Sequence, residues 1–413
     1  MHAKRLLIIG LVWPEPTSSA AGTRMIQLVN LFLANNYEVT FASAAAKSDH
    51  SFMFPQTVKE EHIKLNDESF NQFAKALSPT VVMFDRFMIE EQYGWRVQQE
   101  CPDALRILDT EDLHFLRKAR EESNKKQVDF TFDQFYTIDA KREIAAILRC
   151  DLSLIISEVE VKILLEQFKI DPTILFYLPF LEAKITDKIA AEWILFEERK
   201  DFMFIGNFLH EPNWKTALTL KNEVWPKLSK LLPTAHLNIY GAYATQKVFE
   251  LENKKERFFV RGRTGNAQNT LAKHKVLLAP SKIGAGLKGK FIDAMQVGTP
   301  SVTSNIGAEG MVGDLDWPGI VVDDLDFFIE AAFNLYTDES MWTIAQRNGV
   351  KVINERYCAD NFIALFMSRI DDLRHNLSNH RKVNFIGQVL QHHTLQSNKY
   401  LSLWIEEKNK PRN

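Results

Sequence analysis

The sequence is poor in residues that mark several protein classes. It has three cysteines in 413 residues, Cys101, Cys150 and Cys358, which lie far apart and show no CxxC spacing. This usage argues against a disulfide framework or a cysteine-based metal knuckle, and it favours a reducing, cytoplasmic compartment. No uninterrupted apolar stretch reaches about 18 residues, so a membrane-spanning helix is not expected.

An excess of charge of one sign is also lacking. Fifty basic residues stand against 53 acidic residues, which gives a formal net charge of −3. A nucleic-acid-binding protein needs a basic excess or stripe, so nucleic acid is not an expected partner. Hydrophobic residues make up 46% of the chain and charged residues 25%, as in ordinary globular proteins. At roughly 100 to 200 residues per domain, the length predicts two domains.

The start of the chain predicts a βαβ unit. An apolar run at 6–13 is followed by apolar residues at helical spacing over 25–33, and 38–43 has the pattern of a second strand. A basic start before a short apolar run also fits a signal peptide. Because the run breaks at Pro14 and leads into an amphipathic helix pattern, we interpret it as a buried first strand.

The same alternation of strands and helices continues along the chain. Further strand-like runs lie at 80–85, 105–109, 152–157, 173–179, 201–207, 236–241, 257–262, 275–281, 300–304 and 319–324. We therefore predict an α/β protein with two doubly wound, Rossmann-like domains. The segment 181–200 has no strand pattern, which places the domains at 1–185 and 186–377. The remaining extension, 378–413, is expected to pack back on the first domain, to form a dimer contact, or to be partly disordered.

Glycine is scarce, with 17 in the chain, yet four glycines lie within PSKIGAGLKGKFIDAMQVGTP at 280–300. This stretch follows a strand and precedes a helix, so it lies at the carboxyl end of a parallel strand, where such sheets bind ligands. Glycines such as Gly284 and Gly286 permit close backbone approach, and the unpaired amides of the first helical turn favour an anion.

Charged residues of the same stretch indicate what the anion is. Lys288 and Lys290 add positive charge where the helix begins, which predicts a phosphate or diphosphate site. Asp293 shares a helix face with Lys290, and its carboxylate could accept hydrogen bonds from a ribose diol. The alternative is an exposed ion pair between Lys290 and Asp293, worth on the order of a few tenths of a kcal/mol. The spacing is not that of a P-loop.

The span VLLAPSKIGAGLKGKFIDAMQVGTPSVTSNIGAEGM resembles the nucleotide-sugar signature of the retaining glycosyltransferases of family 4, among the glycosyl transferases group 1. The resemblance covers about residues 1–360 and implies the GT-B fold, in which two Rossmann-like domains face each other across a cleft. That family has an E-x7-E motif before an alanine-rich helix and a G-x-P-V-V strand. FIDAMQVGTPSV matches the second half, with Asp293 where the second glutamate contacts the ribose. Ala285 stands at the first acidic position, which departs from the pattern.

The resemblance also implies donor-site residues in other segments. FIGNFLHEPNWKTALTLKNEVWPKLSKLLPTAHLNIYG resembles the first strand, helix and strand of the donor domain, RFFVRGRTG the segment near the base, and PTSSAAGTR the loop after the first strand. The implied donor-binding residues are Gly22, Gly206, Asn207, Lys215, Arg261, Gly262, Gly284, Gly286, Lys288, Lys290 and Asp293. The alternative for Lys215 is a surface lysine that binds no ligand. The alternative for Arg261 and Arg263 is a solvated side chain.

The acceptor side is expected in the first domain. RILDTEDLHFLRKAR resembles the acceptor-side region of the family, and it concentrates acidic residues and a histidine at a strand-to-helix turn. The candidate catalytic residues are Asp112 and His114. A helix cap for Asp112 and a satisfied helix side chain for His114 are the alternatives.

These observations predict a glycosyltransferase of the hexosyltransferase type. It would move a sugar from a nucleotide-diphosphate sugar to a glycan or lipid-linked acceptor in cell-surface polysaccharide biosynthesis, with retention implied by the family alone. We expect no cofactor, no catalytic metal and a cytoplasmic location, with peripheral contact at the inner membrane as an option. The alternatives are a nucleotide-sugar epimerase or phosphorylase of the same fold, and a non-catalytic partner subunit, the last suggested by Ala285 and by aspartate at 293.

Overall fold

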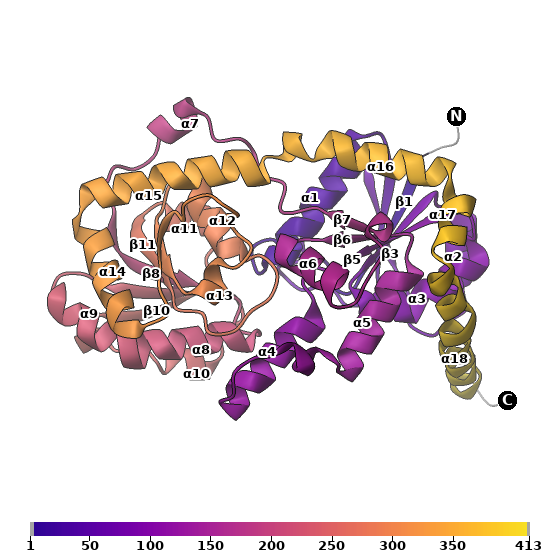
Figure 1. Cartoon of the computed structure of the whole chain (residues 1–413), viewed down its shortest axis with the longest axis horizontal. Helices are drawn as coiled ribbons and strands as arrows, with labels where there is room; N and C mark the ends of the chain where they lie inside the picture. Colours follow the sequence, from indigo (N-terminus) through magenta and orange to yellow (C-terminus); the bar gives the residue numbers. More distant parts are fainter. Residues whose placement is uncertain (1–3, 411–413) are drawn as a thin grey trace.

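The computed structural model of the chain describes residues 4–410, and it describes the side chains of helix α18 (Phe385–Asn409) except those of 393–396. It contains the two predicted Rossmann-like α/β domains, which lie side by side (Figure 1). Among the described residues, no helix is both long enough and apolar enough to cross a membrane.

The first domain has a seven-stranded parallel sheet in the order β3-β2-β1-β4-β5-β6-β7. Its strands are β1 (Arg5–Gly10), β2 (Glu38–Ser43), β3 (Val58–His62), β4 (Val81–Asp85), β5 (Leu105–Asp109), β6 (Leu152–Ile155) and β7 (Leu175–Tyr177). The helices are α1 (Ala20–Ala34), α2 (Ser69–Leu77), α3 (Phe87–Glu100), α4 (His114–Lys126), α5 (Ile138–Arg149) and α6 (Glu158–Glu166). Hydrophobic cores lie on both faces of the sheet, which explains why the central strands are continuous apolar runs.

The strand β3 is absent from the predicted set. Its sequence VKEEH buries only Val58 and exposes the next four residues, because β3 lies at the edge of the sheet. An edge strand with charged side chains resembles a loop in sequence, and such charges protect the open edge from pairing with other chains.

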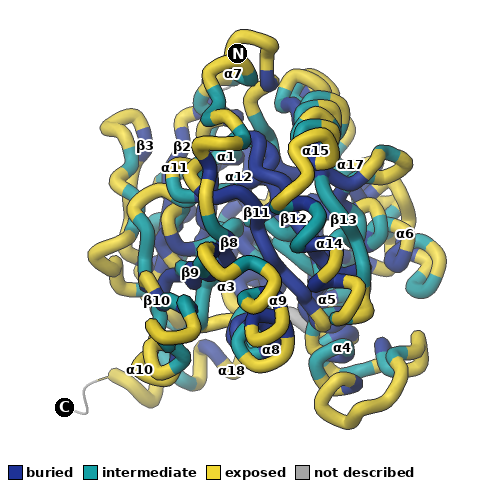
Figure 2. The backbone as a smooth tube through the Cα atoms, turned by 90° about the vertical axis from the view of Figure 1, so that its left-hand side faces the viewer, coloured by how far each residue is buried: buried dark blue, intermediate teal, exposed yellow. Residues whose placement is uncertain are grey.

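The second domain has a six-stranded parallel sheet in the order β10-β9-β8-β11-β12-β13. Its strands are β8 (Lys200–Ile205), β9 (Leu237–Tyr240), β10 (Phe258–Gly262), β11 (His274–Ala279), β12 (Ser301–Thr303) and β13 (Gly319–Val321). Its helices are α7 (Asp187–Ala191), α8 (Glu211–Thr219), α9 (Trp225–Leu231), α10 (Gln246–Phe249), α11 (Ala267–Leu271), α12 (Gly289–Gln296), α13 (Asn305–Ala308), α14 (Leu325–Thr337) and α15 (Glu339–Val352). The buried strands of this sheet lie beneath helices whose outer turns are exposed (Figure 2).

The helical segment after β8 is divided. Residues 211–231 form α8 and α9 with a π-helical turn, Leu220–Val224, between them. Pro226 lies in the first turn of α9 and has no amide hydrogen for the regular i to i−4 bond, which explains a change of helix type at this point.

The chain crosses between the domains twice, and the two crossings lie against each other. Glu182 N–H donates to the Tyr357 carbonyl at 2.8 Å, and Ala359 N–H donates to the Glu182 carbonyl at 2.9 Å. After the second crossing, α16 (Ile363–His375) packs its Phe366 against Phe32 of α1, with ring centroids 6.0 Å apart. The chain therefore returns to the first domain at α16, before residue 377, the predicted end of the donor domain.

The C-terminal extension also lies on the first domain. Helix α17 (Leu377–Val383) precedes α18, which packs on α3 and α5 (Figure 1). Arg381 holds this segment in place, because its guanidinium donates to both carboxylate oxygens of the buried Asp151, each at 2.8 Å. The expectation of partial disorder falls in part on 411–413, which lie outside the described residues.

Candidate active site

Loops from the carboxyl ends of both sheets meet at the domain boundary. The Tyr243 hydroxyl, after β9, donates to the Glu15 carboxylate at 2.6 Å, after β1. Arg263, after β10, donates from Nη1 to the Ser18 hydroxyl at 2.8 Å. Because open parallel sheets bind ligands at these ends, the boundary is the candidate active site.

A buried ion pair fixes the first-domain side of this site. Arg24 of α1 contacts Asp109, at the end of β5, with 2.9 Å between Nη2 and Oδ1, and both side chains are fully buried. Arg24 Nη1 also donates to the Leu178 carbonyl at 2.7 Å. On the neighbouring strand β4, Asp85 Oδ2 accepts from the Leu11 amide at 3.0 Å. These bonds hold the ends of three strands and a crossover in one arrangement.

The turn from β5 to α4 carries the acidic residues found in sequence. Glu111 has a positive φ of 65°, which is uncommon for a residue other than glycine. Its burial and the nearby negative charge of Asp109 raise the pKa of Glu111 to about 8. Glu111 is therefore largely protonated at neutral pH and can donate a hydrogen bond.

Asp112 and His114 lie together in this turn. Asp112 accepts from Arg117 Nε at 2.7 Å, and His114 Nε2 lies 3.3 Å from Asp112 Oδ1. Burial alone would raise the pKa of Asp112, but Arg117 and His114 outweigh it and hold that pKa below its usual value. Burial lowers the pKa of His114 to about 4. At neutral pH the pair is a carboxylate beside a neutral imidazole.

Neither residue caps helix α4, although a cap was the alternative for Asp112. The N-cap position is Leu113, and its side chain makes no cap bond. Instead, Glu143 of α5 accepts from the amides of His114 and Phe115 at 3.1 and 3.0 Å. Burial raises the pKa of Glu143 well above its usual value.

Glu160 of α6 bridges the two domains. Its Oε1 accepts from the Leu113 amide at 3.0 Å and from the Gly286 amide, in the second domain, at 2.8 Å. Its Oε2 is buried and has no hydrogen-bond partner among the described residues. Burial, together with the charge of Asp112, raises the pKa of Glu160 to about 7.

The glycine-lysine loop lies between β11 and α12 and contacts the turn of the first domain. Gly286 has φ of +59°, and a Cβ added there would lie 2.9 Å from the Cβ of Asp112, so a side chain would be strained and crowded. The Gly284 carbonyl accepts from Arg120 of α4 at 2.7 Å. Arg120 also forms a two-point contact with Glu309, at 2.7 and 2.8 Å.

The two lysines of the loop point to different partners. Lys288 Nζ donates to the Gly286 carbonyl at 3.0 Å, and Lys290 Nζ donates to Asn213 Oδ1 at 2.9 Å. Burial lowers the pKa of Lys288 to about 8 and, together with the charge of Lys288, lowers the pKa of Lys290 to about 7. Neither of these bonds is to a carboxylate, and an anionic ligand would supply the charge-assisted partner that a lysine favours.

Asp293 is not paired with Lys290, so the surface ion-pair alternative is wrong. Asp293 Oδ1 accepts from Gln268 Nε2 of α11 at 3.1 Å. Burial raises the pKa of Asp293 to about 6. Asp293 lies about one helical turn after Lys290, near the middle of α12.

Two more predicted donor residues lie beside the lysines. A Cβ on Gly206, at the end of β8, would lie 2.6 Å from the side chain of Asn213, the residue that holds Lys290. The Asn207 carbonyl accepts from Asn213 Nδ2 at 2.8 Å. Asn213 is thus a common neighbour of Gly206, Asn207 and Lys290.

Other predicted donor residues have different surroundings. Lys215 Nζ donates across the domain boundary to Asn124 Oδ1 at 3.3 Å. The exposed Arg261, on the edge strand β10, donates from Nε to Asn238 Oδ1 at 2.9 Å and lies over the ring of Phe259. The Gly262 carbonyl accepts from Gly241. The structure does not bring Arg261 to the lysine loop.

Gly22 is buried at the start of α1. A Cβ there would lie 2.4 Å from the backbone of Glu15. The loop of the first domain that contains Glu15 therefore packs closely against Gly22. The same loop contacts Tyr243 and Arg263 of the second domain.

Sequence reasoning missed Arg120, Glu160, His210 and Glu309. The first, second and fourth take part in contacts between the domains, as described above. His210 lies just before α8, and its pKa is lowered by burial and by the positive charge of Arg117. The available signal for His210 was its position after the carboxyl end of β8, where polar residues gather at ligand sites.

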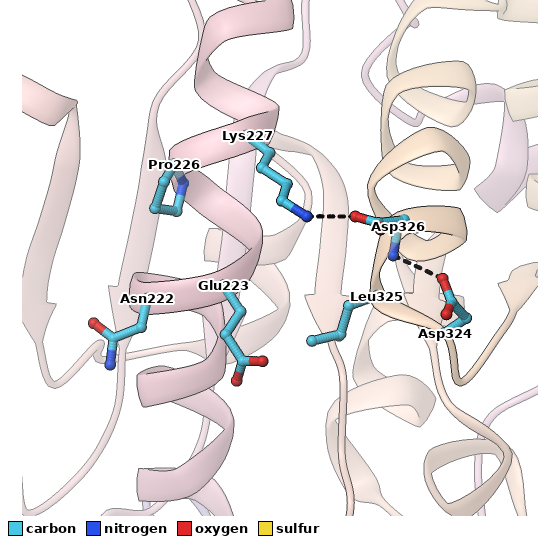
Figure 3. A pocket seen from close by; sticks show the side chains of 7 residues that line it. All are labelled: Asn222, Glu223, Pro226, Lys227, Asp324, Leu325 and Asp326. Atoms are coloured by element: carbon cyan, nitrogen blue, oxygen red, sulfur yellow. Dashed lines mark hydrogen bonds and ion pairs between the residues drawn. The ribbon is translucent and has the colours of Figure 1, made fainter.

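Two cavities lie along α8 and α9. One, of about 330 Å³, lies between the domains and is lined by residues that include Asn124, Lys215 and Lys282. The other, of about 340 Å³, lies beside the start of α14 (Figure 3). Its Lys227 is already paired with Asp326. Among the described residues, no three His, Cys, Asp or Glu side chains are arranged to hold a metal ion.

Comparisons with known proteins agree on the architecture. Residues 199–338 match the model of the family described as glycosyl transferases group 1. No curated protein matches the chain. Sucrose-phosphate synthase from Thermosynechococcus elongatus is similar in structure, with a TM-score of 0.65 and 15% identity over 89% of this chain and 98% of that chain.

Three other structures show the same likeness. TarM gives a TM-score of 0.68 at 10% identity, covering 89% of this chain and 98% of that chain. A second TarM structure, from S. aureus with bound UDP, gives a TM-score of 0.56 at 14% identity, covering 73% of this chain and 58% of that chain. WaaG, a glycosyltransferase involved in lipopolysaccharide biosynthesis, gives a TM-score of 0.62 at 12% identity, covering 89% of this chain and 99% of that chain. The chain therefore has the GT-B fold, and its residues 199–338 are similar to the glycosyl transferases group 1 family.

Proposed function

We propose that the chain is a glycosyltransferase that moves a hexose from a nucleotide-diphosphate sugar to a glycan or lipid-linked acceptor. The observation that carries the proposal is the loop at 284–290, where two partly buried lysines begin a helix opposite a carboxylate and a neutral histidine of the other domain. Support for the nucleotide comes from the TarM structure that holds UDP. Support for a cell-surface polysaccharide pathway comes from the likeness to WaaG, a glycosyltransferase involved in lipopolysaccharide biosynthesis.

The lysines have a defined electrostatic role in this proposal. Transfer breaks the bond between the anomeric carbon and the diphosphate oxygen, and negative charge grows on that oxygen. Lys288, Lys290 and the free amides at the start of α12 stabilise this charge. Asp293, one turn further along the helix, accepts hydrogen bonds from the ribose hydroxyls.

The first domain binds the acceptor in this proposal. The acceptor hydroxyl forms the new bond to the anomeric carbon, and its proton passes to the departing phosphate. The neutral His114 and its neighbour Asp112 orient the acceptor hydroxyl at the end of β5. Retention of the donor configuration and independence from metal ions are parts of the proposal that follow the family resemblance.

Ligand-dependent unfolding tests the donor site. Thermal melting with UDP, GDP, ADP and CMP should show stabilisation by one nucleotide, because a ligand that binds only the folded state raises its stability. The variants Lys288→Ala and Asp293→Ala should abolish the shift, and Lys215→Ala should retain most of it. No shift with any nucleotide at millimolar concentration would contradict the donor site.

A second candidate function rests on one observation. Ala285 stands where the family has its first acidic residue, and it packs against the core of the first domain. A non-catalytic partner subunit would keep the fold without this carboxylate. Turnover distinguishes the candidates, since release of the nucleotide diphosphate in the presence of acceptor glycans is expected only of the enzyme. Release without an acceptor would instead favour an epimerase, phosphorylase or hydrolase reaction.

A further inference from the structure

Helix α18 is amphipathic in the reverse sense. Its polar residues face the first domain, where Gln391 Nε2 donates to the Arg149 carbonyl at 2.6 Å and Asn398 Nδ2 to the Glu91 carbonyl at 3.3 Å. Ser402 is also buried, and its hydroxyl donates to Asn66 at 2.8 Å. A helix on a globular domain normally turns its apolar side inward. Here the anchoring side is polar.

The outward side of α18 is apolar. Six residues at helical spacing point away from the domain: Phe385, Ile386, Val389, Tyr400, Leu403 and Trp404. Their exposed fractions run from 38% to 66%. This outer stripe spans about 29 Å of helix at 1.5 Å per residue. The six residues form two exposed apolar groups, 385–389 and 400–404, one toward each end of the helix, and exposed apolar groups of this kind mark an interaction surface.

We infer that the outer stripe of α18 binds the same stripe of a second copy of the chain, as an antiparallel helix pair about a two-fold axis. In this pairing Phe385 lies opposite the partner's Trp404, Ile386 opposite the partner's Leu403, and Val389 opposite the partner's Tyr400. Every apolar residue of the stripe meets an apolar residue, as a self-complementary interface requires.

Charges at the two ends of the stripe fit the same pairing. The exposed Lys382 precedes the stripe and the exposed Glu407 follows it. The same two-fold axis brings the end of α17, which carries Lys382, toward the end of the partner's α18, which carries Glu407; Glu407 also bonds Lys410 of its own chain. Between 385 and 404 the only lysine or arginine in the sequence is Lys399, which bonds Gln99 of its own domain. Binding to an anionic membrane relies on clusters of about four to eight basic residues, so a second copy fits the stripe better than a lipid surface.

The size of the stripe agrees with a stable dimer. From the exposed fractions, the six side chains offer roughly 700 Å² of surface per copy, which is near the roughly 800 Å² per partner of a standard protein interface. The surface lies on the first domain, so pairing leaves both domain boundaries accessible. The pairing does not depend on the proposed function.

Sedimentation velocity of the full chain tests the inference. We expect the wild type to sediment at twice the chain mass of 47.6 kDa at roughly 10 to 100 µM. Trp404→Asp should give a monomer with an unchanged melting temperature. The matched control is Phe327→Asp on α14, because Phe327 is 64% exposed in the second domain, and this variant should remain a dimer. A monomeric wild type at 100 µM, or a dimeric Trp404→Asp variant, would overturn the inference.

A charge exchange tests the orientation of the pair. Lys382→Glu and Glu407→Lys should each weaken dimerisation by about tenfold, and the two changes combined in one chain should restore it. A combined variant weaker than either single variant would refute the antiparallel arrangement. Co-sedimentation with vesicles of phosphatidylethanolamine and phosphatidylglycerol tests whether the stripe binds a membrane instead of a second copy. Vesicle binding by a monomeric wild type, lost in Trp404→Asp, would assign the stripe to a membrane instead.

Discussion

Replacing Glu160 by glutamine should remove a pH-dependent destabilisation of the folded protein. Glu160 is 1% exposed and its carboxylate accepts from amides of both domains. Its pKa in the folded protein is about 7, above the ordinary value of 4.5. Between these values the folded state holds a proton that the unfolded state has released. The stabilising contribution is thus fully present below pH 4.5 and is lost as the pH rises through 7.

The magnitude follows from the two pKa values. Each pKa unit corresponds to about 1.4 kcal/mol, so the loss in the wild type amounts to about 3 kcal/mol above pH 7. The Glu160→Gln variant does not titrate and keeps a carbonyl oxygen in place of Oε1. Its free energy of unfolding should match that of the wild type near pH 4.5 and exceed it by about 3 kcal/mol at pH 8. For a domain of this size, the corresponding difference in melting temperature is roughly 6 to 12 °C.

Differential scanning calorimetry of both proteins from pH 4.5 to 8 measures this difference. Glu166→Gln is the matched control, because Glu166 lies on the same helix with a side chain 57% exposed. The control should give a difference from wild type that stays constant with pH. A constant difference for Glu160→Gln as well would refute the reasoning, since it would mean that the folded protein does not bury this charge.

Three further predictions follow from the site. Nucleotide affinity should fall by about tenfold per pH unit above pH 7, because Lys290 has a pKa of about 7 and must be protonated to bind the diphosphate; isothermal titration calorimetry across pH 6.5 to 8.5 measures it, and a flat profile would contradict the role of Lys290. Arg120→Ala and Glu309→Ala should show a coupling energy on the order of 1 to 3 kcal/mol in a double-mutant cycle of urea unfolding, whereas additive effects would mean that the contact contributes nothing. Gly286→Ala should destabilise the protein by about 1 to 2 kcal/mol through its left-handed backbone and the crowding at Asp112, while Gly265→Ala, where a Cβ meets nothing within 4 Å, should be nearly neutral; equal effects would refute this explanation.

Much of the fold could be predicted from sequence because central parallel strands are apolar on both faces. The prediction of two Rossmann-like domains is confirmed, and the strands at 38–43 and 105–109 have the predicted bounds. The strand Val58–His62 could not be recognised, because an edge strand needs no apolar alternation. The return of α16 to the first domain depends on contacts such as that of Phe366 with Phe32, which local sequence patterns do not encode.

The candidate site was predictable only in part. The loop carrying Lys288 and Lys290 has a local signature of glycines between a strand and a helix, and its placement at the domain boundary follows from that position. The environment of Asp293 was not predictable, since its partner Gln268 comes from another helix. The role of Glu160 was also hidden, because an acidic residue in the first turn of a helix normally reads as a favourable helix-dipole charge. The proposed roles of Asp112 and His114 stay predictions.

The double crossing between the domains constrains the order in which the chain folds. The second domain is one continuous segment, so a ribosome has synthesised all of it before α16, α17 and α18 emerge. The first domain contains residues made both early and late, since Phe366 completes its core and Arg381 bonds Asp151, just before β6. Although domains made first usually fold first, here the domain that begins the chain is the last to be finished. Part of the apolar surface of its sheet therefore stays uncovered until residues 363–409 have been made, which takes roughly 2 to 10 seconds at 5 to 20 residues per second.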